Sequence, residues 1–96
     1  MSELNPGAKL SMAVNRLAAS AAPIQQRLNM AALIGLVELD PEDFERPDER
    51  ALFERIMERL TAADRVEDST SAMDDGEAEQ VAHDIVELHW QLRAQS

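Results

Sequence analysis

The chain has 96 residues and a formal net charge of −10, and it contains no cysteine. This length fits a single domain with a hydrophobic core, and the lack of cysteine excludes disulfides and thiolate metal sites. The negative charge argues against direct binding to nucleic acid or to an anionic membrane surface, because both depend on lysine and arginine.

Residues 1–7 lack the basic segment and the apolar run of a signal peptide. The longest apolar stretch, residues 30–37, is much shorter than the roughly 20 residues that span a bilayer. We therefore expect a cytoplasmic protein that makes no membrane contact.

The acidic residues are concentrated in the middle of the chain. Residues 38–79 hold sixteen of the nineteen acidic residues and five arginines, a local balance of −11. Residues 1–37 hold Glu3 against Lys9, Arg16 and Arg27, a balance of +2. The sequence thus predicts an apolar, faintly basic helical surface followed by an anionic one.

Two apolar helices are predicted before residue 40. Leu10, Val14 and Leu17 recur at helical spacing, which predicts a helix over residues 8–21. Pro23 interrupts the run and fits either the first turn of a second helix over residues 23–39 or a kink in one continuous helix.

The second of these helices is apolar over much of its circumference. Such a helix lies either in the centre of a bundle or against another subunit. Gly35 weakens the helix, so we interpret it as a point of close helix–helix contact.

Residues 39–44 contain a local helix-start signal. Asp40 fits the N-cap, Pro41 fits the first helical position, and the Asp43 carboxylate can reach back to the cap. Leu39 and Phe44 occupy the positions of a hydrophobic staple. We predict a short helix over residues 41–46, which Pro47 ends.

The rest of the chain predicts two more long helices. An apolar stripe indicates a helix over residues 47–62, and residues 63–73, which lack a stripe, are predicted to form a loop. Asp74 and Glu77 fit a second capping box at the start of a helix over residues 74–94. No alternating strand pattern is present. We expect one all-α domain: a small bundle of four main helices and one short helix, without β-sheet.

No group of residues predicts catalysis, a metal or a cofactor. His83 and Glu87 are four positions apart, but a helical zinc site needs two histidines at this spacing and a further ligand. The acidic residues of 42–49 lack the glycine and the alternation of a calcium loop. Serines and histidines cannot be assembled into a triad from their spacing. A metal-binding or catalytic domain is therefore a minor alternative.

We expect a non-enzymatic regulatory or adaptor module that binds proteins and forms a homodimer through its N-terminal helices. Trp90 fits either a core edge or a partner anchor, and a core edge is favoured because burying its ring removes a large apolar area from water. The residues predicted to form the apolar contact are Leu17, Ile24, Leu28, Ala31, Ile34, Val37 and Trp90.

The acidic surface suits a basic protein partner, although charge that only keeps the protein soluble is the simplest interpretation. The residues predicted to contact such a partner are Glu42, Glu45, Asp64, Glu67, Asp68, Asp75 and Glu79. An alternative function is an inhibitor that mimics nucleic acid, of the anti-restriction or anti-CRISPR type, with carboxylates spaced like duplex phosphates. The arginines that interrupt the acidic helix count against mimicry; they are Arg46, Arg50, Arg55 and Arg59.

Overall fold

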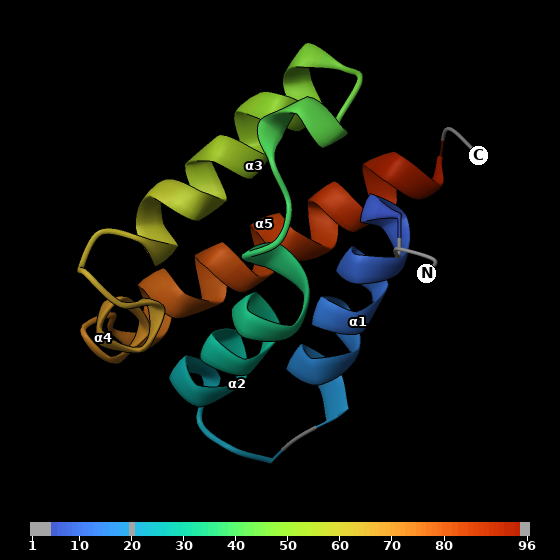
Figure 1. Cartoon of the computed structure of the whole chain (residues 1–96). Coiled ribbons are helices and arrows are strands. Elements are labelled where there is room, and N and C mark those ends of the chain that lie inside the picture. Colours follow the sequence, from blue (N-terminus) through green and yellow to red (C-terminus); the bar gives the residue numbers. More distant parts are fainter. Residues whose placement is uncertain (1–4, 20, 95–96) are drawn as a thin grey trace.

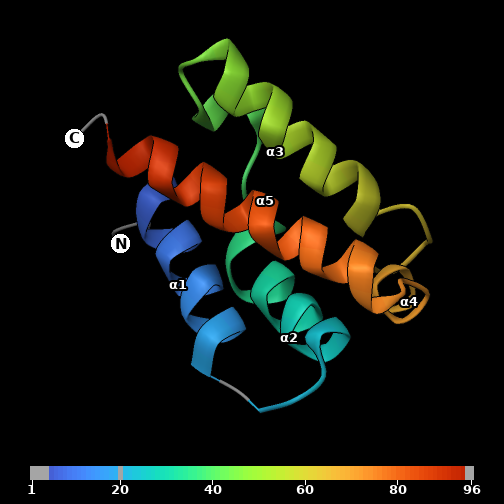
Figure 2. The same cartoon turned by 180° about the vertical axis from the view of Figure 1, so that it is seen from behind.

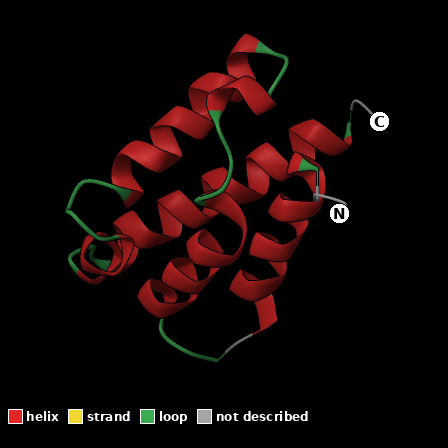
Figure 3. Ribbon diagram, viewed as in Figure 1, coloured by secondary structure: helices red, strands yellow, loops and turns green. Residues whose placement is uncertain are grey.

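The computed structural model describes residues 5–19 and 21–94, which form a bundle of helices without a strand (Figures 1 and 3). The α-helices are α1 (Pro6–Ala19), α2 (Ile24–Ala31), α3 (Pro47–Leu60), α4 (Val66–Ser71) and α5 (Asp75–Arg93). Two short segments, the π-helical η1 (Ala32–Leu36) and the 3-10 helix η2 (Pro41–Asp43), lie between α2 and α3. The predicted all-α class is confirmed.

The long helix α5 is the centre of the bundle. It packs against α1 and α2 along one side and against α3 along another, and Figure 2 shows it crossing in front of these helices when the molecule is seen from behind. Its Val81, Ile85 and Leu88 are fully buried. The rings of Phe44 and Phe53, with centroids 4.9 Å apart, fill the space next to α3.

The first two helices are separate, so the alternative of one kinked helix is wrong. Asn5 caps α1, because its Oδ1 accepts a hydrogen bond of 2.7 Å from the Ala8 N–H. Arg27 stabilises the other end, since its guanidinium donates to the carbonyl oxygens of Leu17 and Ala22, each at 2.8 Å. The Leu17 carbonyl is one of those that the end of α1 leaves without a partner inside the helix, and the Ala22 carbonyl lies in the connection to α2.

The second helix is α-helical only as far as Ala31 and continues as the π-helical turn η1, where the Val37 N–H donates to the Ala32 carbonyl at 3.0 Å. Gly35 lies in this turn against α1. A Cβ at Gly35 would overlap the Lys9 carbonyl oxygen and lie 3.1 Å from the Ala13 Cβ. The close helix–helix contact predicted at Gly35 is confirmed.

Both predicted helix starts carry cap hydrogen bonds. The Asp40 N–H donates to Asp43 Oδ2 at 2.8 Å, and the Glu77 N–H donates to Asp74 Oδ1 at 2.7 Å. The helix that begins after Asp40, η2, is a single turn and does not extend over the predicted residues 41–46. It ends there because Phe44 takes an extended conformation (φ −110°, ψ 129°) and its side chain is fully buried.

The predicted loop at residues 63–73 is wrong in part, because it contains the short helix α4. Its hydroxyl side chains bond locally: Ser69 Oγ donates to the Arg65 carbonyl at 3.2 Å and accepts from the Ala63 N–H at 2.9 Å. Gln25 of α2 donates to the Met73 carbonyl at 3.2 Å. Tertiary contact with α2 and local hydroxyl bonds thus support a helix that has no apolar periodicity.

Replacing Gly35 with alanine should lower the free energy of unfolding by roughly 1–3 kcal/mol, because the added methyl group forces α1 and η1 apart. Gly76→Ala is the matched control. Its Cβ would have Asp74 Oδ1 as its nearest neighbour, at 3.5 Å, and alanine is the better helix former by about 1 kcal/mol. Urea unfolding followed by circular dichroism measures both. A Gly35→Ala protein as stable as wild type would contradict the close contact.

Candidate functional site

Three exposed apolar side chains form a line on the outside of α2 and η1. Met30 is 42% exposed, Leu33 is 55% exposed and Val37 is 42% exposed. Their spacing of three and four residues places them on one side of the helical segment. We call Met30, Leu33 and Val37 the apolar stripe.

The opposite side of the same segment is part of the core. Leu28, Ala32 and Leu36 are fully buried where α2 and η1 pack against α1 and α5. The segment is therefore apolar on two sides, and the chain itself covers one of them. Figure 1 shows α2 and α1 side by side at the edge of the bundle.

The apolar surface extends from the stripe onto α1. A shallow groove of about 360 Å³ lies between α1 and η1, and it is lined by Met12, Asn15, Arg16, Ala19 and Ile34. Lys9 pairs with Glu38 at 3.0 Å at the edge of this surface. We call the outer side of α1, α2 and η1 the α1–α2 face. It combines apolar side chains with little negative charge.

The structure divides the seven predicted apolar contact residues. Leu17, Leu28 and Ala31 are buried inside the chain's own core, Ile24 and Ile34 are half-buried, and Val37 and Trp90 are exposed. Met30 and Leu33, which widen the apolar surface of the second helix, were not predicted as contacts. Their spacing with Val37 is the signal in the sequence that could have identified them.

Trp90 is 62% exposed, so the interpretation as a core edge is wrong. The Arg93 guanidinium carbon lies 5.9 Å from its ring centroid, which is a cation–π distance.

The neighbouring His89 has a pKa below its usual value. Burial of the imidazole is the larger cause, and the positive charge of Arg93 is the second. Folding therefore favours neutral His89, and protonating it on acidification opposes folding.

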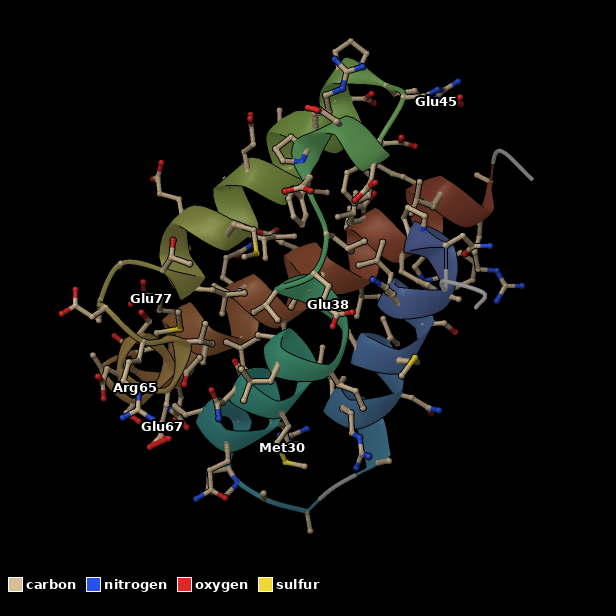
Figure 4. The ribbon with its side chains drawn as sticks, viewed as in Figure 1. Met30, Glu38, Glu45, Arg65, Glu67 and Glu77 are labelled. Atoms are coloured by element: carbon tan, nitrogen blue, oxygen red, sulfur yellow. The ribbon has the colours of Figure 1, made fainter. Side chains whose placement is uncertain are left out.

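The seven predicted acidic contact residues are all exposed, but they do not form one surface. Glu42 and Glu45 lie before α3, and the other five lie after it. The 14 residues of α3 separate the two groups by about 20 Å, and Figure 4 shows Glu45 and Glu67 at opposite ends of the bundle. We call the larger group the acidic end: Asp64, Glu67, Asp68, Asp75 and Glu79.

The arginines of α3 are bound to their own chain. Arg50 donates to the carbonyl oxygens of Phe44 and Glu45, at 2.7 and 3.1 Å. Arg55 contacts the buried Asp84 at 3.5 Å, and Arg59 contacts Glu77 at 3.7 Å. They stabilise the turn before α3 and the α3–α5 contact.

A second groove, of about 340 Å³, lies between α2 and α4 next to the Met30 end of the stripe. Most of the side chains that line it are polar. We call it the polar groove: Gln25, Gln26, Asn29, Met30, Glu67, Thr70 and Ser71.

Within residues 5–19 and 21–94, no three histidine, aspartate or glutamate side chains are grouped so that they could bind a metal ion. None of the helices in the described part of the chain combines the length and the apolar character required to cross a membrane.

No protein-family model matches the chain, and no curated protein or solved structure is significantly similar to it. The α1–α2 face, the acidic end and the polar groove are thus the features from which a function can be argued.

Trp90 is the single tryptophan of the chain, so fluorescence reports on it directly. We expect an emission maximum close to that of free tryptophan and efficient quenching by acrylamide, because most of the ring is in contact with water. Trp90→Ala should change the free energy of unfolding by no more than about 1 kcal/mol. A blue-shifted emission that acrylamide does not quench would contradict this placement.

Proposed function

We propose that this protein is a non-enzymatic interaction module that forms a homodimer through its α1–α2 face. The apolar stripe is the observation that carries the proposal. Met30, Leu33 and Val37 are each 42–55% exposed on a helix whose other side is already core. Covering such a surface is favourable because it removes apolar area from water, and contiguous exposed apolar patches mark interaction sites in soluble proteins.

Charge makes the α1–α2 face the side through which two copies of the chain can approach each other. Each copy carries a net charge of −10, so most relative orientations bring carboxylates against carboxylates. The α1–α2 face lacks this penalty, because Arg16 is cationic and the charge of Glu38 is offset by Lys9. Two anionic copies thus meet with least repulsion through this face.

The size of the face also limits the geometry of the dimer. A stable interface buries about 800 Å² per partner, which is about one seventh of the 5922 Å² surface of this chain. Three partly exposed side chains do not supply that area. The interface that we propose therefore includes the groove between α1 and η1, with Met12 and Ile34 in contact with the stripe of the other copy.

A second candidate function is supported by the acidic end. Its five acidic residues are all exposed, and Arg65 is the one arginine in the sequence between Asp64 and Glu79. A homodimer through the α1–α2 face leaves these carboxylates outside. They are then free to bind a basic protein, or to mimic nucleic acid for a protein that binds it.

Light scattering of the purified chain at several concentrations tests the dimer. We expect a dimer in the wild type and a monomer for Leu33→Lys, because the substitution places an ammonium group in the apolar contact. The lysine also reduces the net negative charge of each copy, so a loss of the dimer cannot come from greater overall repulsion. Trp90→Lys is the matched control: the same kind of change, at the exposed tryptophan of α5, should leave the dimer intact.

Salt dependence separates the two candidate functions. Association of like-charged copies through an apolar face should become stronger as salt rises from about 50 to 500 mM, because salt screens their repulsion. Capture of a basic partner by the carboxylates should become weaker over the same range. A wild-type chain that is monomeric at high salt and high protein concentration would refute the dimer.

A further inference from the structure

The polar groove between α2 and α4 contains many hydrogen-bond acceptors. The hydroxyl groups of Thr70 and Ser71 donate to the Glu67 carbonyl, at 3.1 and 2.7 Å. Gln25 Nε2 donates to the Met73 carbonyl and to Asp75 Oδ1, at 3.2 and 2.9 Å. Thr70 is buried, whereas Ser71 is exposed. Because these donors bond within the chain, the Ser71 hydroxyl oxygen and the Gln25 side-chain carbonyl keep lone pairs for a ligand.

Asn29 adds an acceptor that has no partner. It lies on α2 between the glutamines and Met30, and its Oδ1 is buried without a hydrogen bond in the described structure. Buried side-chain oxygens are nearly always bonded, since leaving one unpaired opposes folding. An unpaired acceptor on a residue that lines a groove indicates a ligand that donates hydrogen bonds.

The charge of the groove is negative. Glu67 is the one ionisable residue among the described side chains that line the groove. Its carboxylate makes a loose contact of 3.9 Å with the exposed Arg65. Asp64, Asp68 and Asp75 of the acidic end lie close by in the chain. Figure 4 places Glu67 and Met30 at the same end of the bundle, so a cation near Glu67 can place an aliphatic stem on Met30.

We infer that the polar groove binds the cationic end of an alkylguanidinium or alkylammonium group. The Glu67 carboxylate supplies the countercharge, Asn29 and the Ser71 hydroxyl group accept its N–H groups, and Met30 contacts the stem. A guanidinium fits best, because its five donors in one plane match several acceptors. The source that we favour is an arginine side chain of a partner protein. This inference does not depend on homodimer formation.

Nuclear magnetic resonance titration tests the site with two probes, N-acetylarginine amide and spermine. We expect saturable shifts of the side-chain amide signals of Gln25, Gln26 and Asn29 and of the backbone amides of Thr70 and Ser71. Tighter binding of the arginine probe supports a protein source, and tighter binding of spermine at the same signals would overturn that source in favour of a free polyamine. N-acetylcitrulline amide, the neutral counterpart of arginine, should bind at least about tenfold more weakly.

Glu67→Gln should weaken binding of the arginine probe roughly tenfold, because it removes the countercharge of the guanidinium. Glu54→Gln, the same change at an exposed residue of α3, should leave binding as in wild type. Asn29→Leu should weaken binding while the midpoint of urea unfolding stays the same or rises, because the unpaired oxygen is removed. A merely structural asparagine would lower that midpoint.

Two results would overturn the inference. One is that the shifts spread over all acidic segments and that Glu67→Gln and Glu54→Gln reduce them equally. This result would show diffuse electrostatic attraction and no specific site. The other is equal binding of the citrulline and arginine probes. The titration is repeated with the Leu33→Lys variant, where binding should be retained, so that failure of the site and failure of the homodimer are distinguished.

Discussion

The close approach of η1 to α1 at Gly35 is the contact on which the rest of the arrangement depends. Without a Cβ, the chain at Gly35 lies directly on the Lys9 carbonyl and next to Ala13. This contact sets which side of the α2–η1 segment faces inward. Leu28 and Leu36 are consequently buried, and the apolar side chains on the other side of the segment remain in water. The exposed apolar stripe thus follows from where the helices meet.

Charge in this molecule has structural as well as surface roles. Asp43 and Asp74 accept hydrogen bonds at helix starts, Arg27 and Arg50 donate to backbone carbonyls, and Asp84 is buried beside Arg55. These groups are used within the chain. The carboxylates that remain for a partner are fewer, and they lie in two groups at opposite ends of α3 rather than in one continuous row.

Most of the fold could be predicted because its signals are local. The caps at Asp40 and Asp74 and the punctuation by Pro23 and Pro47 depend on residues within one turn of each other, and the structure retains them. Helix α4 could not be predicted in this way, because its polar sequence has no apolar period. Its stability comes from hydroxyl bonds to its own backbone and from contact with α2, which lies about forty residues earlier in the chain.

The sequence by itself determined that the chain is helical, where most helices start, and that the second helix is apolar on more than one side. Only the tertiary structure decided which of those sides faces water, because Leu28 and Leu33 are equally apolar and differ only in what packs against them. The same holds for Trp90, whose exposure depends on which sides of α5 are covered by α1, α2 and α3. The α2–α4 groove likewise exists only where two distant segments meet. Periodicity identifies a face of a helix, whereas exposure is a property of the assembled bundle.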